Sequence, residues 1–369
     1  MIMETIRIAR TALTAFCREV FVRLGLNELD AAAAADVLVA ADARGIHSHG
    51  VGRLWRYANG LKSGQMRPDA EPRTLMESPM SLVVDAQGGM GAPASVSAMR
   101  RIIEKASAAG AAFASVRESN HNGISGYYAM MALPHNMLGI AMTNTAALGV
   151  PTFGRQVMFG TNPLAFAAPA DKERGFVLDM STTVVTRGKV EVYERLEKPL
   201  PQGWAVDRRG QPATDAHAML DDMLRRVGGG ILPLGGGGME QGGHKGFGLA
   251  VMVDILCAVL GGAAFGHAIS DTATTSARVS HFFGAIRIDR FRDPAEFRHD
   301  MDRLLGELRA CPPSKGEDRV YFAGLREFEM EDECNRKGVP VLKKSYDELC
   351  SIGVAEGVEP PTPMPEVLR

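Results

Sequence analysis

Between residues 80 and 181 the chain alternates between short β-like runs and helical stretches, and this alternation restricts the fold more than any other feature. The β-like runs are SLVVD (81–85), AAFASV (111–116), LGIAMTN (138–144), LAFAAP (164–169) and FVLDMS (176–181). Helical sequence occupies 93–109 and the region near 125–133. Alternation of this kind is typical of an α/β domain. We therefore expect a sheet covered by helices in the middle of the chain.

The rest of the chain is mostly helical in character. Residues 4–62 are predicted to be helical, and Asp30 is a plausible N-cap for the alanine-rich stretch 31–43. Residues 199–243 are rich in Gly, Pro and Asp and predict long loops. Further helices are predicted at 246–263, 294–310 and 324–338, with a strand at 281–289 and a Pro-rich extended tail after 356. We expect helical parts at 1–75 and 291–355, an α/β part at 76–290 and a tail at 356–369.

The composition excludes several classes of protein. Apolar residues make up 46% and charged residues 23%, which is too apolar for a disordered chain, and the net charge of −2 provides no field to hold a nucleic acid. The five cysteines form no C-x-x-C pair, and charged residues interrupt the N-terminal apolar run, so we expect a cytoplasmic protein without a signal peptide. Residues 246–266 imitate a membrane span, but Asp254 would cost about 2.5–3.5 kcal/mol at a bilayer centre. We therefore expect a buried core helix there and no membrane partner.

The loop from Arg44 to Arg53 (RGIHSHGVGR) concentrates groups capable of proton chemistry. A neutral imidazole with a pKa near 7 suits proton exchange with a hydroxyl, and an arginine suits two-point binding of a carboxylate. His47 and His49 could instead be zinc ligands, but no C-x-x-C or H-E-x-x-H pattern accompanies them, so we expect no metal. The ordinary alternative is a capped helix end with a surface histidine.

Three further clusters lie at predicted element boundaries. The stretch 118–123 (ESNHNG) follows a predicted strand, so His121 could project into a cleft. Asp179 ends another strand and could bind ribose hydroxyls. A glycine-rich run leads to His244 and Lys245 at the start of an apolar helix, where backbone N–H groups and the lysine form a sound phosphate site, although a flexible linker is the alternative.

Residues 89–94 (GMGAPA) match the G-x-G-x-x-A pattern of dinucleotide-binding Rossmann domains. Asp85 would place a negative charge near the pyrophosphate, and Pro93 removes a backbone donor where the loop should present one. Glu118 also lies further along than the usual spacing of about 20 residues. We interpret the match as a turn and a helix start.

Taken together and in order, these clusters resemble the malate/L-lactate dehydrogenase family, which also holds ureidoglycolate, sulfolactate and 2,3-diketogulonate enzymes. The matching stretches are DARGIHSHGVGRL, SNHNGISGYYA, MTN with GTNPLAFAAP, LDMS with RGKVEV, LPQGWAVD with RGQPATD, and LPLGG with HKGFGLA. The resemblance covers nearly the whole chain. It implies a non-Rossmann α/β fold of the L-sulfolactate dehydrogenase type, with a nicotinamide-binding domain, a helical subdomain built from both chain ends, and a homodimer.

The resemblance also implies roles for individual residues. His49 and His121 would be acid/base residues, and Arg53 with Asn120 would bind the substrate. The positions implied to hold NAD or NADP are Thr145, Thr161, Asn162, Phe176, Val177, Leu178, Asp179, Met180, Ser181, His244, Lys245, Gly324, Leu325 and Arg326. The family's Pro-Gly cofactor turn reads Ala323-Gly324 here, and Thr182-Thr183 follow LDMS where Ala or Ser is common. We therefore expect the cofactor pocket to differ locally.

The sequence as a whole predicts an enzyme that transfers hydride reversibly between NAD(P) and a small 2-hydroxy or 2-keto acid. Arg53 would orient the carboxylate, and His121 or His49 would exchange the hydroxyl proton, with His121 preferred because it follows a strand end. One alternative is an imine reductase of the same fold that acts on a cyclic imine carboxylate. Another is a cofactor-binding protein without catalysis. The sequence leaves open the substrate and the choice between NAD and NADP.

Overall fold

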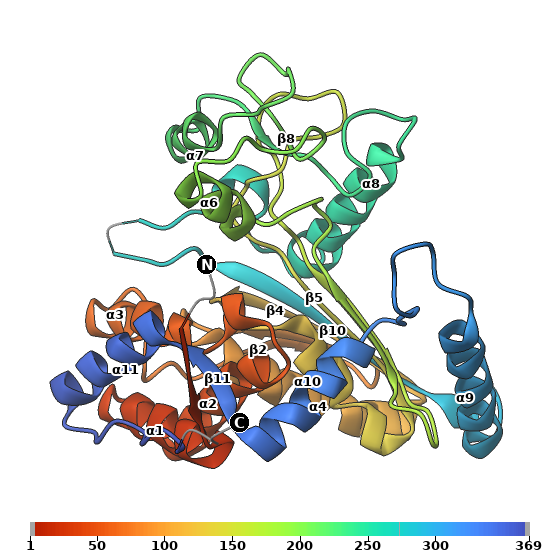
Figure 1. Cartoon of the computed structure of the whole chain (residues 1–369). Coiled ribbons are helices and arrows are strands. Elements are labelled where there is room, and N and C mark those ends of the chain that lie inside the picture. Colours follow the sequence, from red (N-terminus) through yellow and green to blue (C-terminus); the bar gives the residue numbers. More distant parts are fainter. Residues whose placement is uncertain (1–3, 273, 366–369) are drawn as a thin grey trace.

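A seven-stranded sheet runs through the middle of the computed structural model, which describes residues 4–272 and 274–365 (Figure 1). Its strand order is β2-β3-β4-β10-β5-β6-β7. The strands are β2 (Arg73–Glu77), β3 (Ser81–Asp85), β4 (Ala111–Ser119), β5 (Met137–Thr143), β6 (Leu164–Ala168), β7 (Phe176–Met180) and β10 (Val279–Arg287). Only β3 and β4 pair in parallel, and the other neighbours are antiparallel. A Rossmann sheet is parallel, so the predicted non-Rossmann α/β fold is confirmed.

The G-x-G-x-x-A match is the start of helix α4 (Gly91–Ala109). A Cβ on Gly91 would overlap the backbone of Asn120, so the glycine allows the helix to approach β4. Asp85 accepts a hydrogen bond from the Gln87 N–H at 2.9 Å and lies 3.5 Å from Arg117. These contacts are those of a packed turn. Helix α5 (Ser125–Met130) covers the same face of the sheet over β5 and β6.

The first and last strands of the chain lie side by side. Strand β1 (Thr5–Ile8) pairs with β11 (Val339–Leu342), so the prediction of helix throughout 4–62 is wrong at its start. The sequence did not reveal this strand because its partner lies more than 300 residues away. Helices α1 (Arg10–Arg23), α2 (Glu28–Ala43), α3 (Leu54–Lys62) and α11 (Lys343–Glu356) gather around this ribbon.

At the chain ends the predicted N-cap of α2 needs correction, whereas the Pro-rich tail is extended in its described part, as predicted. The N-cap of α2 is Asn27 rather than Asp30, because the Asn27 side chain accepts the Asp30 N–H at 3.0 Å. The described part of the Pro-rich tail is fixed, since the Met364 N–H donates to the Arg7 carbonyl at 2.8 Å. The predicted tail beyond residue 365 lies outside the described residues.

The segment 291–355 divides between two places. Helix α10 (Leu325–Lys337) packs against α2 beside β11, whereas α9 (Pro294–Ala310) lies at the far end of the β6–β7 hairpin. There Asp302 accepts the backbone N–H groups of Lys172 and Glu173. The domain boundaries expected from the sequence remain a prediction.

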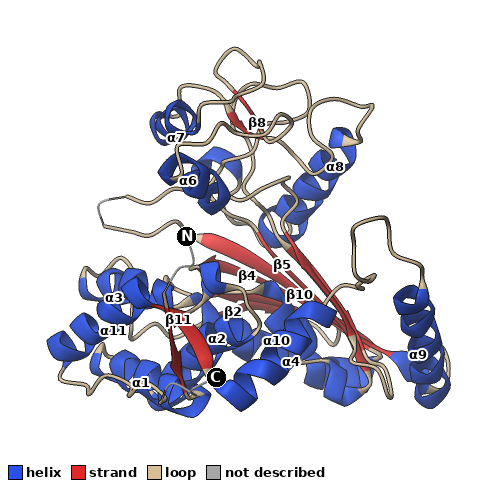
Figure 2. Cartoon of the chain, viewed as in Figure 1, coloured by secondary structure: helices blue, strands red, loops and turns tan. Residues whose placement is uncertain are grey.

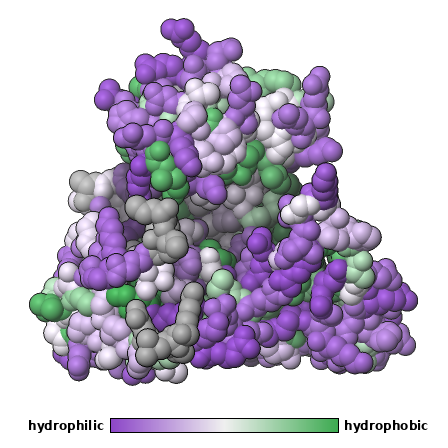
Figure 3. Space-filling view, in the orientation of Figure 1, coloured by the Kyte–Doolittle hydropathy of each residue, from purple (hydrophilic) through white to green (hydrophobic). Residues whose placement is uncertain are grey.

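A smaller lobe stands above the sheet, and we call residues 184–254 the upper lobe (Figure 2). It contains α6 (Arg187–Arg195), β8 (Ala205–Val206), α7 (Ala216–Arg225), β9 (Gly230–Ile231) and α8 (Gly243–Asp254). The prediction of loops over 199–243 is wrong at α7, whose apolar residues Met219, Leu220 and Met223 recur at helical spacing and are buried. The glycines and prolines on either side of α7 made this helical spacing of apolar residues difficult to recognise in the sequence. A recess separates the upper lobe from the rest of the molecule (Figure 3).

Helix α8 is only half buried, which corrects the prediction of a core helix. It continues into a π-helical turn, η4 (Ile255–Val259). Ala250, Val253 and Cys257 are inside, whereas Val251, Ile255 and Val259 are 38%, 50% and 53% exposed. Within 4–272 and 274–365, no helix is long and apolar enough to cross a membrane.

Candidate active site

His49 and Arg53 lie on two short 3₁₀ turns, η1 (His47–His49) and η2 (Val51–Arg53), that connect α2 to α3. The Ser48 hydroxyl lies 2.8 Å from Nδ1 of His49. Burial, with a smaller effect from the Arg53 charge, lowers the pKa of His49 to about 4. The ring is therefore neutral near pH 7.

His121 lies between β4 and α5, and its Nδ1 atom accepts two hydrogen bonds. The Gly123 N–H approaches Nδ1 at 3.3 Å, and the Tyr57 hydroxyl lies 2.6 Å from the same atom. Because Nδ1 is an acceptor toward Gly123, the tyrosine donates, and the proton of the neutral ring is on Nε2. Burial lowers the pKa of His121 well below its ordinary value and raises that of Tyr57 to about 12. Both groups are therefore neutral near pH 7.

The two predicted histidines come together from distant parts of the chain. The ring centroids of His49 and His121 lie 5.3 Å apart, with 23° between their planes. Arg53 belongs to the same group, because its charge lowers the pKa of both rings. The Arg53 Nε–H donates to the Ser48 carbonyl at 2.7 Å. Its guanidinium forms no ion pair with any described residue, so its outer N–H groups are available to a carboxylate.

Asn120 was predicted to bind the substrate, but its side chain is buried and its amide is bound to the backbone. It is 1% exposed, and its amide donates to the carbonyl groups of Gly88 and Gly89 at 3.0 and 2.7 Å. The Ser276 hydroxyl donates to its side-chain oxygen. Both amide donors are therefore used to fix the turn before α4, and we leave Asn120 out of the proposed substrate site.

A cavity of about 270 Å³ lies between β7, α5 and the turn before α10. Five predicted cofactor positions line it, namely Val177, Leu178, Asp179, Gly324 and Arg326. The Gly126 N–H donates to Oδ2 of Asp179 at 2.7 Å. Burial raises the pKa of this carboxyl to about 6, with the Gly126 hydrogen bond and Arg44 opposing. Asp179 therefore presents a carboxylate to the cavity at neutral pH.

The remaining predicted cofactor positions are spread over three places. Leu325 packs in an apolar cluster with Phe322 and Phe176 beside it, and so faces the core. Thr145, Thr161 and Asn162 meet where β5 and β6 lead to the upper lobe, since the Thr161 N–H donates to the Thr145 hydroxyl at 3.0 Å and Oδ1 of Asn162 accepts the Thr145 N–H at 3.1 Å. Met180 and Ser181 follow Asp179 toward the same junction.

Asn162 is wholly buried and acts as a brace, because its amide also donates to the Ala250 carbonyl of α8 at 2.9 Å. His244 and Lys245 lie in the first turn of α8, after Gly242 with φ +87°. Lys245 is exposed, and no described contact joins these two residues to the histidine pair.

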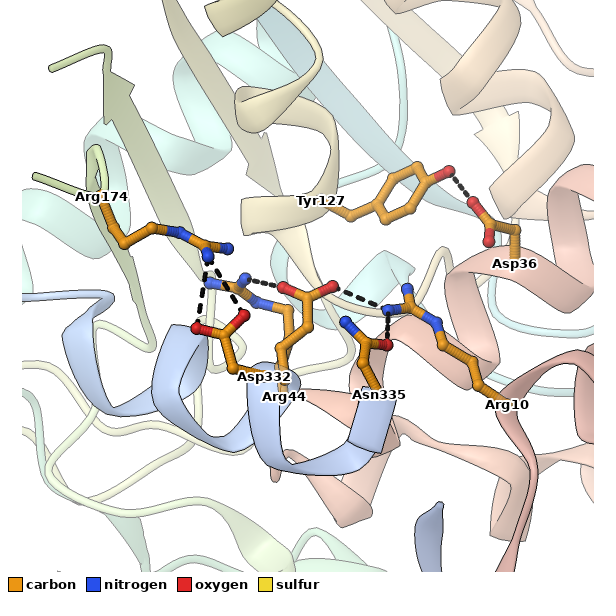
Figure 4. A network of polar contacts seen from close by, with 8 residues as sticks. Arg10, Asp36, Arg44, Tyr127, Arg174, Asp332 and Asn335 are labelled. Carbon is orange, nitrogen blue, oxygen red and sulfur yellow. Dashed lines mark hydrogen bonds and ion pairs between the residues drawn. The ribbon is translucent and has the colours of Figure 1, made fainter. Parts of the chain in front are cut away.

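A network of charges fixes helix α10 to the start of the His49 loop (Figure 4). Glu331 accepts from Arg44 at 2.9 Å and from Arg10 at 3.0 Å. The Arg44 guanidinium also lies 4.5 Å from the centre of the Phe328 ring. Arg44 lines the cavity that contains Asp179, so this network connects the cavity wall with the loop that carries His49.

The chain matches the family model described as malate/L-lactate dehydrogenase over residues 8–350. The chain belongs to this family. It is 39% identical to malate dehydrogenase from Pyrococcus horikoshii over 354 residues, 96% of each chain. It is 36% identical to L-sulfolactate dehydrogenase from Methanocaldococcus jannaschii, over 90% of this chain and 92% of that one.

Solved structures of malate and sulfolactate dehydrogenases have the same fold as this chain. Malate dehydrogenase from Entamoeba histolytica superimposes with a TM-score of 0.92 at 30% identity, covering 98% of this chain and all of that one. The sulfolactate dehydrogenase of M. jannaschii superimposes with a TM-score of 0.86 at 32% identity, covering 96% of this chain and 98% of that one. The predicted L-sulfolactate dehydrogenase type of fold is confirmed, and the chain is an oxidoreductase of this family.

Two polar residues at the site were not predicted. Tyr57 is on α3, four residues after Arg53, which is the N-cap of that helix, so a spacing of about one helical turn could have indicated it. Asp42 contacts the His49 loop from inside α2. His281, which was also not predicted, is wholly buried on β10 with Nε2 2.9 Å from the Ser119 hydroxyl.

Proposed function

We propose that this protein is an NAD(P)-dependent dehydrogenase of small 2-hydroxy acids, working reversibly on the matching 2-keto acids. The observation that carries the proposal is the joint placement of His49, His121 and Arg53. Two neutral imidazoles and a cation that forms no ion pair with the described residues suit a substrate with a hydroxyl or keto oxygen beside a carboxylate. The relatives named malate and sulfolactate dehydrogenases support this substrate class.

The protein's part of the reduction is to hold the acid and supply a proton. Arg53 binds the carboxylate through its outer N–H groups, which orients the neighbouring keto carbon. Nε2–H of His121 donates to the keto oxygen while Nδ1 takes the Tyr57 proton, so the ring stays neutral. The phenolate left on Tyr57, whose pKa burial raises to about 12, then regains a proton from water before the next turnover. In the oxidative direction each proton moves back.

The residues around the 270 Å³ cavity fit a nicotinamide dinucleotide. The Asp179 carboxylate can accept hydrogen bonds from ribose hydroxyls. The first turn of α10, whose Arg326 and Glu327 line the cavity, presents backbone N–H groups suited to phosphate. When bound, the nicotinamide supplies the hydride that adds to the keto carbon.

We also propose that a second copy of the chain covers the exposed stripe of Val251, Ile255 and Val259. Apolar residues at a spacing of four on one helical face are typical of a buried contact. The cytoplasmic location expected from the unpaired cysteines remains a prediction.

One observation favours a second candidate. The chain is 34% identical over 260 residues to a Pseudomonas putida protein named Delta(1)-pyrroline-2-carboxylate/Delta(1)-piperideine-2-carboxylate reductase. A cyclic imine carboxylate presents the same carboxylate to Arg53, with C=N in place of C=O.

A substrate panel distinguishes the two. Purified protein is incubated with 2-keto acids and cyclic imine carboxylates, each with NADH and with NADPH, and coenzyme absorbance is followed. We expect oxidation of coenzyme with one or more 2-keto acids. Turnover of the imines alone would replace the proposal with the second candidate, and coenzyme binding without turnover would contradict both.

A further inference from the structure

We propose that Asp42 is a positioning residue that fixes the loop carrying His49 and Arg53 in its working geometry. The proposal rests on the proposed function for the roles of those two residues. Its own basis is the contact between the Asp42 carboxylate and three residues of the loop.

The placement of Asp42 is unfavourable for the helix that contains it. It is 3% exposed and lies one residue before the end of α2, where the helix dipole disfavours a negative charge. Its neighbours on α2 are buried alanines and valines. No described lysine or arginine pairs with it. A buried carboxylate in such surroundings is destabilising unless other groups satisfy it.

The loop satisfies both oxygens of this carboxylate. Oδ1 of Asp42 lies 2.9 Å from Nδ1 of His47, and Oδ2 accepts the Val51 N–H at 2.6 Å. These two contacts lie on either side of His49. They hold the turn η1 and the first residue of η2 against the end of α2.

Gly50 shows how tightly the loop closes on the carboxylate. A Cβ at this position would overlap the carboxyl group of Asp42. The φ of Gly50 is −86°, so the backbone conformation itself does not call for glycine. The absence of a side chain is needed because the Asp42 carboxylate occupies that space.

His47 is the partner that reports on the contact. Its side chain is 43% exposed, and its hydrogen bond to Asp42 raises its pKa above the ordinary value. His47 is not one of the stacked rings of the site. Its titration can therefore be followed by NMR without disturbing His49 or His121.

A double-mutant cycle tests the contact. Asp42→Ala and Gly50→Ala are each expected to lower kcat/KM on the best 2-keto acid at least about tenfold, since small misplacements of catalytic groups reduce rates strongly. The double variant should be no worse than Asp42→Ala, because the Gly50 methyl then has room. If the loss of kcat/KM in the double variant equals the product of the losses in the two single variants, the proposal is overturned.

A matched control separates positioning from stability. Asp222 is also a buried helical carboxylate, 2.8 Å from Arg208, but it lies on α7 in the upper lobe. Asp222→Asn should lower Tm and leave kcat and KM unchanged, whereas Asp42→Asn should change kcat and KM beyond its effect on Tm. If Asp42→Asn behaves like Asp222→Asn, the carboxylate is merely structural.

Two readouts do not depend on the proposed function. Asp42→Asn should return the pKa of His47 toward its ordinary value in an NMR titration and should speed hydrogen exchange of the Val51 amide. If wild-type protein turns over no substrate, the proposed function fails while these two measurements still decide the proposal. An unchanged His47 pKa and unchanged Val51 exchange would overturn it.

Discussion

The Tyr57 hydroxyl lies 2.6 Å from Nδ1 of His121, and Tyr57 is buried while His121 is partly buried. The tyrosine comes from α3 and the histidine from the end of β4, so the contact joins the helical layer to the sheet. It fixes which ring nitrogen carries the proton. The arrangement gives Tyr57 a part in proton transfer that can be measured.

Replacing Tyr57 with phenylalanine should lower kcat more than it raises KM. The ring stays, while the donor to Nδ1 is lost, so His121 can adopt the wrong tautomer. We expect a loss of about tenfold to a hundredfold, smaller than the roughly 10²–10⁴-fold effect of a general acid itself. Steady-state kinetics across pH measure this, and Tyr346→Phe on α11 is the matched control. An unchanged kcat would remove Tyr57 from the proton path.

Arg53→Ala should act mainly on substrate binding. Hydrogen bonds to charged groups contribute about 1.5–3 kcal/mol, so KM should rise about tenfold to a hundredfold. Arg53→Lys should recover only part of this, because lysine lacks the planar pair of N–H groups. Arg23→Lys on the exposed face of α1 is the control. If Arg53→Ala instead raises the Kd of NADH, Arg53 binds the cofactor rather than the substrate.

Cofactor affinity should depend on the ionisation of Asp179. Burial raises its pKa to about 6, so the carboxylate is ionised above that pH and protonated below it. If the carboxylate accepts ribose hydroxyls, affinity for NAD⁺ should rise as pH increases through about 6. Calorimetric titration between pH 5 and 8 tests this. Asp179→Asn should remove the pH dependence, and its persistence in that variant would assign it to another group.

The apolar stripe on α8 and η4 predicts a defined oligomer. Ile255→Glu should convert a dimer into a monomer, because it places a charge in the middle of the contact. Light scattering after size-exclusion chromatography measures the mass. Leu29→Glu provides the control, since Leu29 is 80% exposed on α2, away from the stripe. A wild-type protein that is already monomeric would contradict the proposed contact.

The strands that were predicted are those whose burial appears in the sequence. β4 begins with the mostly apolar run 111–116 and β10 contains the apolar run 282–286, as expected for the central strands of a covered sheet. β2 was missed because all five of its residues are exposed at the sheet edge. β1 and β11 were missed because each is four residues long and is stabilised by a partner at the other end of the chain.

The candidate site was predicted through its motifs and only partly through its contacts. His49, Arg53 and His121 stand in motifs that point to proton and carboxylate chemistry, and the fold brings them together. Asn120 has the same polar character, but the Gly88 and Gly89 carbonyl groups use its donors. Whether a polar side chain binds a substrate or the backbone depends on the tertiary structure, which the sequence motif does not show. Tyr57 and Asp42 were missed for the converse reason, because one resembles a core aromatic and the other a helix-end charge.

The most direct test of the account compares His121→Ala and His49→Ala with wild-type protein on the best 2-keto acid, with NADH binding measured for each. We predict that at least one variant loses turnover by about 10²–10⁴-fold while binding NADH like the wild type. Full turnover in both variants would contradict the assignment of proton transfer to this histidine pair.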